Sequence, residues 1–453
     1  MLNTLNLIIQ TIEANGGKIY FVGGFVRDKL LNIASKDVDI EVFGLSYQQL
    51  FEILEQFGKV DLVGKAFGVL KVTIYGQDYD FNLPRKDSKN GIGHKGFSIS
   101  VDHTMTIEEA ASRRDFTINS MSIDSKGNLV DPFNGREDLR NRKLNPTSIT
   151  FKDDVLRILR AFQFSARFDL FSSYLLNDYC FDMIKDYYTL PKERIWEEWK
   201  KWALKGKYYS QSLRVLRHIN VITLYPEIDN IVTIKQDPTF HPEGRVIVHT
   251  GYVLDAMHDI CVIENVDENT RLVLIFSALC HDFGKATCTQ TKDNGRITAY
   301  GHEAASGPLT ESFLTSIGCP RSIIDRTKSL VSQHMSANQV LSNKAIRRLS
   351  VRLNSETIRN LALLIEADQS GRPPLAKKCS DKLIYLITQS FKLGILDGQA
   401  KPFVVGQDLL NLGYTPGPIF GKLLKKLYEM QISGSITSKE QGLSRVRSLV
   451  NCL

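Results

Sequence analysis

A glycine pair followed closely by an Asp-x-Asp sequence constrains the fold of this chain more than any other feature. Gly23-Gly24 follows the apolar segment Ile19–Val22, which has the composition of a strand, and a short helix is predicted after it at Val26–Leu31. Such glycines let the backbone approach a phosphate, and helix N-terminal amides favour the anion. Asp37 and Asp39 lie on the next predicted strand, where alternation turns both carboxylates to one face. The sequence therefore predicts a phosphate cradle beside a carboxylate pair suited to Mg²⁺.

Each part of this pattern also has an ordinary interpretation. A Gly-Gly pair is usually a turn, and an Asp-x-Asp sequence is usually a solvated strand. The order of strand, glycine pair, helix with Arg27-Asp28, and acidic strand is far more specific than either part alone.

Length and composition set broad limits. A chain of 453 residues is expected to form three or four domains, and a net charge of +7 permits a polyanionic partner without demonstrating one. The seven cysteines are scattered and lack CxxC spacing, which indicates reduced thiols in the cytoplasm instead of a disulfide framework or zinc site. No signal-type N-terminus and no apolar run of about 18 residues is present, so no membrane association is expected.

The pattern of apolar residues predicts an α+β protein, with a small α/β head followed by a long α-helical body. Apolar spacing of three and four residues dominates from about residue 150 onward. An amphipathic helix is predicted at Leu5–Asn15. The predicted strands of the head are Ile19–Val22, Val38–Phe43, Val69–Tyr75, Tyr79–Asn82, Ile118–Asp124 and Leu129–Asp131.

A third carboxylate for a two-metal site is predicted on the strand around Tyr79. Asp80 is the candidate, and Asp78 shares its face by alternation, so the choice between the two stays open. An exposed strand residue is the alternative interpretation of Asp80. The polar stretch 86–95 that follows is expected to be a flexible loop beside the site.

Two further clusters carry arginine beside aspartate. Arg113 and Arg114 can bind a triphosphate, Asp115 can contact ribose hydroxyls, and the apolar residues within the stretch up to Asn119 predict a strand there. Asp153-Asp154-Val155-Leu156-Arg157 is predicted to begin a helix.

Within that helix, Asp154 and Arg157 are expected to share a face, where the carboxylate can accept from the exocyclic amine of cytosine or adenine. Guanine and uracil carry a carbonyl at the position of that amine, so the pair would reject them. An ordinary surface ion pair is the alternative interpretation.

Together these motifs resemble class II tRNA nucleotidyltransferases, the CCA-adding enzymes. Phe21–Leu31 resembles the first motif of the family, and Asp131–Gly135 resembles the turn that closes its head. Asp153–Arg157 resembles the EDxxR template for nucleotide selection, with aspartate in place of the first glutamate. Glu193–Glu198 resembles the motif ending the neck, where Arg194 and Glu198 would support the template helix.

The resemblance implies a polymerase-β-like nucleotidyltransferase head and an elongated all-α body. It implies two Mg²⁺ ions on Asp37 and Asp39, and Asp80 is expected as the third catalytic residue beside them. The nucleotide-binding residues implied are Gly23, Gly24, Arg27, Arg113, Arg114, Asp115, Asn119, Asp154, Arg157 and Arg160. The implied domains are 1–140 for the head, 141–205 for a helical neck, 206–238 for a linker, 239–395 for a metal-binding module, and 396–453 for a tRNA-binding tail.

The third segment carries histidines and aspartates in the order H…HD…D, which resembles the HD phosphohydrolase superfamily. The expected ligands of a divalent transition metal (Ni²⁺, Co²⁺ or Mn²⁺) are His249, His281, Asp282 and Asp368. His302 and His334 are candidates for outer or second-metal ligands. The implied activity is 2′,3′-cyclic phosphodiesterase or phosphatase action on damaged RNA ends, although a purely structural module is the alternative.

The last segment resembles the family's tail. A Gly-Pro turn is predicted to open a basic helix, in which Lys422, Lys425 and Lys426 would contact phosphates of the tRNA elbow. A helix with basic residues that serve only solubility is the alternative interpretation.

The function expected from the sequence is addition of C, C and A to the tRNA 3′ end from CTP and ATP, by a monomer or homodimer. One alternative is an enzyme adding only CC or only A, or a poly(A) polymerase. A second alternative is an HD phosphohydrolase whose head only binds nucleotide, and a third is an RNA-binding scaffold.

Overall fold

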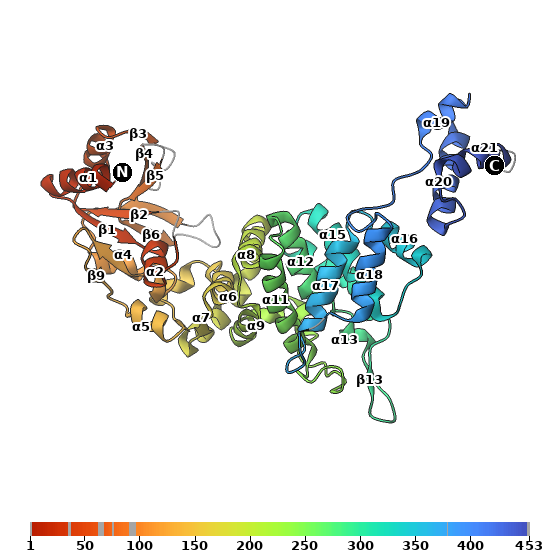
Figure 1. The fold of residues 1–453 in the computed structure, drawn as a ribbon. Coiled ribbons are helices and arrows are strands. Elements are labelled where there is room, and N and C mark those ends of the chain that lie inside the picture. Colours follow the sequence, from red (N-terminus) through yellow and green to blue (C-terminus); the bar gives the residue numbers. More distant parts are fainter. Residues whose placement is uncertain are drawn as a thin grey trace. The chain divides into compact units, whose positions relative to one another are not determined.

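A computed structural model describes residues 2–34, 38–61, 68–74, 77–89, 97–377 and 379–450. The chain divides into two compact units, Met1–Leu224 and Tyr225–Leu453. Figure 1 shows the mixed sheet in the first unit and the almost wholly helical second unit. The division falls inside the predicted linker 206–238, and the finer five-domain division stays a proposal.

The first unit is built on a seven-stranded sheet with the order β3-β4-β5-β2-β1-β8-β9. Its strands pair antiparallel except for β2 and β5, which are parallel. The strands are β1 (Lys18–Val22), β2 (Asp39–Phe43), β3 (Lys59–Asp61), β4 (Val69–Ile74), β5 (Gln77–Asn82), β8 (Ser122–Asp124) and β9 (Leu129–Val130). Two separate two-stranded pairs are β6 (Arg85–Lys89) with β7 (Phe97–Val101), and β10 (Lys143–Leu144) with β11 (Phe171–Ser172).

One face of this sheet carries the apolar core. Ile40 and Val42 of β2 are buried in a cluster with Ile8 of α1 (Leu2–Ala14) and Leu50 of α3 (Tyr47–Glu55). Because strand side chains alternate, Asp39 and Glu41 point to the opposite face of β2. The helices and 3-10 helices of the head are α1 (Leu2–Ala14), α2 (Gly24–Leu30), α3 (Tyr47–Glu55), α4 (Ile107–Ser112), η2 (Thr117–Asn119) and α5 (Gly135–Arg140).

The predicted strand Ile118–Asp124 is wrong in its first half, because Thr117–Asn119 forms a 3-10 turn and the strand begins at Ser122. The buried carboxylate of Asp115 accepts from the backbone N–H of Phe116 and from Asn119 Nδ2. Such local side-chain bonds compete with a strand ladder, which explains the turn.

The remainder of the first unit is helical and packs around aromatic residues. Phe162 contacts Trp199 and Trp202, and Trp202 packs edge-on against Tyr209. The elements are η3 (Ile149–Asp153), α6 (Arg157–Phe168), α7 (Tyr174–Met183), η4 (Ile184–Thr189), α8 (Lys192–Lys205), α9 (Tyr209–His218) and η5 (Val221–Leu224).

The second unit is a helical bundle with a short hairpin, β12 (Gln290–Thr291) and β13 (Ile297–Thr298). One helix, α11, is long and apolar enough to cross a membrane by length and composition, but more than half of it is buried inside this unit. Its elements are α10 (Pro226–Asp229), α11 (Val246–Ile263), α12 (Glu268–Cys280), α13 (Lys285–Cys288), α14 (His302–Ser316), α15 (Arg321–Val331), η6 (His334–Asn338), α16 (Asn343–Arg352), α17 (Ile358–Ser370), α18 (Asp381–Lys392), α19 (Gly406–Asn411), α20 (Pro418–Ser433) and α21 (Lys439–Val450).

Helices α19, α20 and α21 share an apolar cluster of their own. Leu423 and Leu427 of α20 are buried there, four residues apart on one helix face. The lysines Lys422, Lys425 and Lys426 lie on the exposed side of the same helix.

Candidate active sites

A cleft of about 1100 Å³ opens on the polar face of the head. Gly23, Gly24 and Asp39 line it, together with residues of α6 and α8. The other predicted site residues along its walls are Arg27, Arg113, Arg114, Asp115, Asn119, Asp154, Arg157, Arg160 and Arg194. Motifs that extend from Gly23 to Arg194 in the sequence therefore meet at one cavity.

The glycine pair joins β1 to α2. Gly23 has φ 67°, a left-handed conformation that disfavours a side chain, and an added Cβ there would meet no atom within 4 Å. Glycine is thus required by the turn itself, and the turn brings the start of α2 to the cleft.

Acidic residues of the central strands lie next to this turn. The parallel register pairs Asp39 with Asp80 and Glu41 with Asn82, so all four side chains share one sheet face. The cleft is lined by Asp39, Glu41 and Asn82, whereas Asp80 is half-buried beside it. Asp37 lies outside the described residues, as does the side chain of Asp78.

Glu41 is a cleft residue that the sequence analysis missed. Its Oε2 forms an ion pair with Arg114 Nη2 at 2.8 Å, and burial raises the pKa of Glu41 despite that partner. The alternation that places Asp37 and Asp39 on one face extends to Glu41, and this was the available signal.

A buried polar network joins the first motif to the third. Arg27 donates from Nε to Asp28 Oδ1 at 2.9 Å and from Nη1 to Asn119 Oδ1 at 2.5 Å. Asn119 in turn donates from Nδ2 to Asp115 Oδ1 at 2.9 Å. These residues are at least nine-tenths buried, so the network fixes their positions at the cleft wall.

Asp115 also binds the first turns of α6. Arg160 donates from Nε to Asp115 Oδ2 at 2.7 Å. Burial alone would raise the pKa of Asp115, but the Arg160 charge and the hydrogen bonds from Asn119 and Arg160 outweigh it and lower that pKa. The carboxylate is therefore held ionised.

The expectation that Asp154 and Arg157 share a helix face is wrong, because α6 begins at Arg157 and Asp154 is extended. Asp154 Oδ1 accepts from the N–H of Leu156 at 3.0 Å, which turns the chain into the helix. The two side chains nevertheless line the same cleft.

Asp154 and Arg157 are held in place by different partners. Arg157 donates to the carbonyl oxygens of Thr150 and Arg113 at 2.8 and 2.7 Å. Arg194 Nη2 lies 3.3 Å from Asp154 Oδ2. Glu198, one helical turn after Arg194 in α8, is buried, and its Oε1 accepts from Lys201 at 2.8 Å.

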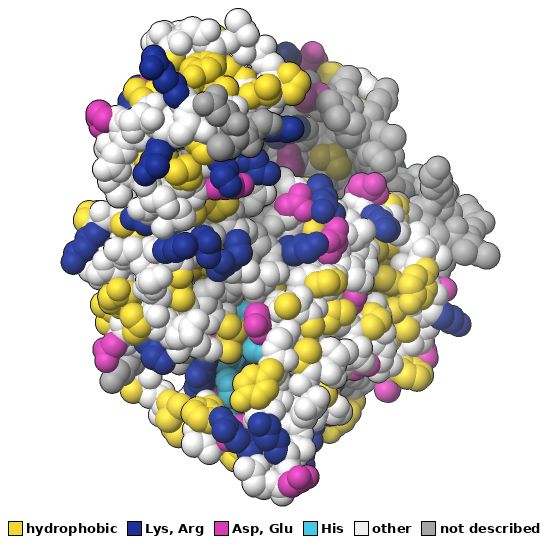
Figure 2. Space-filling model, turned by 90° about the vertical axis from the view of Figure 1, so that its right-hand side faces the viewer, with side chains coloured by type: hydrophobic (Ala, Val, Ile, Leu, Met, Phe, Trp, Pro, Cys, Tyr) yellow, Lys and Arg dark blue, Asp and Glu magenta, His cyan; other side chains and the backbone are white. Residues whose placement is uncertain are grey.

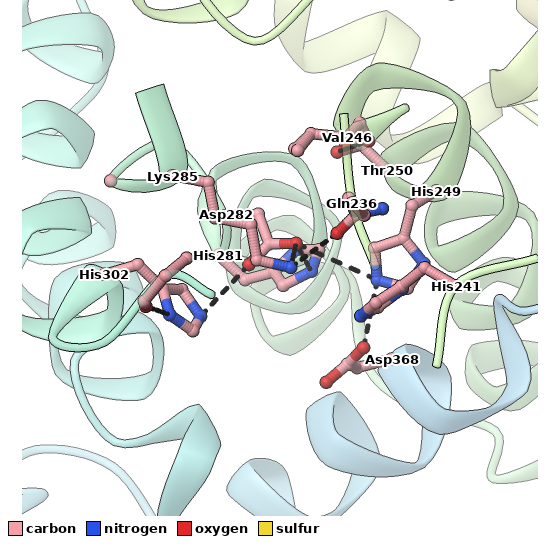
Figure 3. A network of polar contacts seen from close by, with 12 residues as sticks. Gln236, His241, Val246, His249, Thr250, His281, Asp282, Lys285, His302 and Asp368 are labelled. Atoms are coloured by element: carbon pink, nitrogen blue, oxygen red, sulfur yellow. Dashed lines mark hydrogen bonds and ion pairs between the residues drawn. The ribbon is translucent and has the colours of Figure 1, made fainter. Parts of the chain in front are cut away.

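The second unit holds a buried cluster of histidine and aspartate, drawn in Figure 3. His249 comes from α11, His281 and Asp282 directly follow α12, and Asp368 comes from α17. His249 Nε2 lies 3.0 Å from Asp368 Oδ1 and 3.9 Å from Asp282 Oδ2, and His281 Nε2 lies 3.2 Å from Asp282 Oδ2. The predicted H…HD…D set thus converges at one point.

Charged groups surround this cluster. Lys285 Nζ lies 2.7 Å from Asp282 Oδ2, and Arg372 Nη2 lies 2.9 Å from Asp368 Oδ1. Burial would raise the pKa of each aspartate, but His281 and Lys285 hold the pKa of Asp282 well below its usual range, and Arg372 does so for Asp368.

A cavity of about 970 Å³ leads to the cluster. It is lined by His241, His302, His334, Asp368 and Arg372, among others. Figure 2 shows histidine side chains in a hollow with lysine and arginine beside it. The arrangement combines buried metal-ligating groups with open access and positive charge.

Comparisons with known proteins identify relatives over most of the chain. Residues 19–145 match the family described as the poly A polymerase head domain. The multifunctional CCA protein of Methylobacillus flagellatus is 33% identical over 367 residues, covering 78% of this chain and 84% of that protein. Its counterpart from Aromatoleum aromaticum is 31% identical over 374 residues, covering 80% of this chain and 86% of that protein.

Solved structures share the fold at lower identity. A CCA-adding enzyme of Bacillus stearothermophilus in complex with CTP superposes with a TM-score of 0.67 at 19% identity, over 100% of this chain and 99% of that one. A Thermotoga maritima CCA-adding enzyme complexed with tRNA gives a TM-score of 0.60 at 20% identity, over 99% and 95% of the two chains.

Proposed function

The chain belongs to the family of bacterial CCA-adding enzymes, and from that premise we propose that it adds C, C and A to the 3′ end of tRNA, using CTP and ATP. The observation that carries this proposal is the head cleft, where the glycine turn, Asp39, the Arg113–Asp115 motif and the pair Asp154 and Arg157 meet. We place this function in the cytoplasm, where the free cysteines of the described residues would stay reduced. The active protein is proposed to be a monomer or a homodimer.

The cleft fits Mg²⁺, because the carboxylates of Asp39 and Glu41 lie on the same face of the sheet and line the cleft. Arginine side chains line the same cleft. Asp39 with Asp37 and Asp80 would hold the metal, and a bound ion would neutralise charge on the attacking and leaving oxygens. The head residues themselves would orient the triphosphate: Arg113 and Arg114 bring guanidinium charge to the cleft wall, and Glu41 holds Arg114 in place there. In the reaction, the tRNA 3′-hydroxyl oxygen bonds to the α-phosphorus, its proton is lost, and the bond to pyrophosphate breaks.

Base selection is assigned to Asp154 and Arg157. The carboxylate would accept from the amine of cytosine or adenine, and guanine and uracil would leave it facing a carbonyl. Arg194 supports this role, because its guanidinium contacts Asp154 Oδ2 and so fixes the direction of the carboxylate. Arg160, held on Asp115, keeps the first turns of α6 beside the ribose-contacting motif.

The tail is proposed to contact tRNA phosphates through Lys422, Lys425 and Lys426. Their ammonium groups lie on the exposed side of α20 and carry no base specificity. The tRNA complex of the Thermotoga maritima enzyme, which shares the fold, supports tRNA as the partner.

A second activity is supported by the metal-ligating cluster. We propose that His249, His281, Asp282 and Asp368 bind Ni²⁺, Co²⁺ or Mn²⁺ and hydrolyse 2′,3′-cyclic phosphates or terminal phosphates at damaged RNA ends. Imidazole and carboxylate donors suit these metals, and Lys285 and Arg372 supply positive charge for a phosphate. Assays of 2′,3′-cyclic AMP with each metal test this activity, and absence of hydrolysis with all three would refute it.

The alternatives to full CCA addition use the same head. The cleft would be needed in each alternative: a poly(A) polymerase, an enzyme adding only CC or only A, and a hydrolase with a nucleotide-binding head. The metal-ligating cluster argues against the polymerase, and the intact acidic strand argues against a head that only binds nucleotide.

The direct test of the head is nucleotide incorporation into a tRNA lacking its CCA end. Asp39→Asn should abolish incorporation while tRNA binding stays within a few-fold, because the tRNA contacts lie elsewhere. Asp186→Asn, an exposed aspartate of η4, is the matched control and should retain wild-type turnover. Near-normal turnover of Asp39→Asn would overturn the assignment.

A further inference from the structure

We propose that the β12–β13 hairpin and two aromatic side chains at the mouth of the cavity of about 970 Å³ bind the single-stranded 3′ end of an RNA chain. Tyr300 and Phe240 would stack on its last bases, and Lys292 and Arg296 of the hairpin would contact phosphates upstream of them. The inference rests on the proposed hydrolytic function, and it names the substrate of that site as the end of a polynucleotide instead of a free nucleotide.

Two exposed aromatic side chains border the cavity. Tyr300 is 74% exposed and Phe240 is 53% exposed, and both line the cavity wall. Each is close in sequence to a histidine of the same wall, because Phe240 directly precedes His241 and Tyr300 lies two residues before His302. Two residues of chain span at most about 7 Å, so the Tyr300 backbone lies next to the entrance of the buried cluster.

The hairpin is attached to the segment that carries Phe240. The backbone N–H of Ile297 in β13 hydrogen bonds to the carboxylate of Asp237. The same carboxylate accepts from the N–H of Thr239 at 3.0 Å, and the Asp237 carbonyl oxygen accepts from the N–H of His241 at 2.9 Å. Asp237 therefore holds the turn with Phe240 and the hairpin with its basic residues together as one wall of the mouth.

Basic side chains of the hairpin lie beside the Tyr300 ring. The Lys292 ammonium lies over this ring, with Nζ 5.5 Å from the ring centroid, and Lys292 is exposed. Arg296 is also exposed and lines the cavity. Figure 2 shows lysine, arginine and hydrophobic side chains around the hollow that contains the histidines. A cation over one face of an exposed ring leaves its other face open to a base.

Aromatic faces beside basic side chains are a general means of binding single-stranded nucleic acid, since every base can stack and every linkage carries a negative charge. A polynucleotide end supplies both a base for Tyr300 and upstream phosphates for Lys292 and Arg296. A free cyclic nucleotide supplies the base but no upstream phosphate. Because the mouth leads to groups suited to phosphoester hydrolysis, an RNA end fits it better than a protein partner.

Fluorescence at position 300 tests this binding without depending on hydrolysis. The full-length protein carrying Tyr300→Trp keeps an aromatic ring there, and a base stacked on the indole quenches its emission. The probe is a single-stranded RNA octamer with a 3′-phosphate, titrated in the presence of EDTA. We expect quenching that saturates. Tyr188→Trp places an indole at a similarly exposed position of η4, in the other compact unit, and should show no quenching.

Further substitutions in the Tyr300→Trp protein separate the contacts at this one site. Phe240→Ala should weaken the titration roughly 5- to 150-fold, the range that base stacking on an aromatic side chain gives. Lys292→Gln and Arg296→Gln should each flatten the slope of log affinity against log salt concentration by about 0.7, because each removes one phosphate contact to a single strand. Lys344→Gln changes an exposed lysine of α16 outside the cavity lining and should leave affinity and slope unchanged.

The outcomes keep this binding site distinct from the proposed hydrolysis. Quenching that responds to the substitutions, without hydrolysis under any metal, would support the RNA site and refute the hydrolytic function. Hydrolysis of 2′,3′-cyclic AMP by the wild type, with no quenching of Tyr300→Trp by the octamer, would overturn the RNA site and leave the hydrolytic function standing. Equal affinity for 3′-AMP and for the octamer, or a salt slope unchanged in both hairpin variants, would overturn the assignment to a polynucleotide.

Discussion

The guanidinium of Arg160, near the start of α6, donates to Oδ2 of Asp115 at 2.7 Å. This contact ties the proposed base-selecting segment to the proposed ribose-contacting motif, 45 positions earlier in the chain. Asp115 is also bound to Asn119, which accepts from Arg27, so the first motif belongs to the same network. Substitutions in the network are therefore expected to affect folding as well as catalysis.

Arg160→Ala should lower the free energy of unfolding by about 1.5–3 kcal/mol, because it removes charge-assisted hydrogen bonds from a buried carboxylate. Arg140→Ala breaks an exposed ion pair with Glu137, which solvent screens, and should change the free energy of unfolding much less. Urea unfolding of both variants measures the difference. Equal losses would contradict a structural role for the Arg160 contact.

The stabilisation from Asp115 should depend on pH. Its pKa is lowered in the folded protein, so ionised Asp115 contributes stability above the unfolded value of about 3.9. That contribution is lost as the pH falls through the lower folded pKa. The difference in unfolding free energy between wild type and Asp115→Asn should be constant from about pH 5 to 7 and shrink below about pH 4. A difference that grows on acidification would contradict the shift.

Selection of the incoming base should relax when Asp154 or Arg157 is replaced by alanine. A good bidentate contact contributes about 1–3 kcal/mol of discrimination, so incorporation of UTP or GTP relative to CTP should rise roughly 5- to 150-fold. Single-nucleotide incorporation with each of the four nucleotides measures the ratio. Asp153→Ala alters a neighbouring carboxylate that does not line the cleft, and it should keep wild-type selection. Full selectivity in both cleft variants would move the role to other residues.

Asp282→Ala should eliminate metal-dependent hydrolysis of a cyclic-phosphate RNA end and yet keep nucleotide addition. Losing a ligand shared by the cluster leaves the ion undercoordinated, so bound transition metal should also fall. The acidic residues of the head belong to the other compact unit and should be unaffected. Joint loss of both activities, with the fold intact by circular dichroism, would argue against independent sites.

The central strands could be predicted from sequence because their apolar residues alternate or cluster. Thus Ile19–Val22 lies within β1, and the predicted Val38–Phe43 corresponds to β2. The prediction failed at Thr117–Asn119, where buried polar bonds to Asp115 determine the local conformation. It also failed to predict β3 and β6, which carry charged residues, and β6 occupies the start of the stretch 86–95 that was expected to be a loop. The strand β7 was missed although its residues alternate between apolar and polar types.

The candidate sites were predictable where a motif is local in sequence. His281 and Asp282 are adjacent in the sequence, and the glycine pair leads directly into α2. The ion pairs of Asp282 with Lys285 and of Asp368 with Arg372 were missed, although spacings of three and four residues were an available signal for them. The extended conformation of Asp154 was missed because its own side chain caps the following turn.

The central claim is that one head adds C, C and A in order, and stepwise addition to shortened tRNAs tests it most directly. Three tRNAs are used, ending at the discriminator base, after the first C and after the second C, each with labelled CTP alone or labelled ATP alone. We predict that CTP extends the first tRNA by two residues and the second by one, and that ATP adds one residue only to the third. Repeated ATP addition regardless of the tRNA end, or failure of either nucleotide to be used on its expected end, would contradict the account.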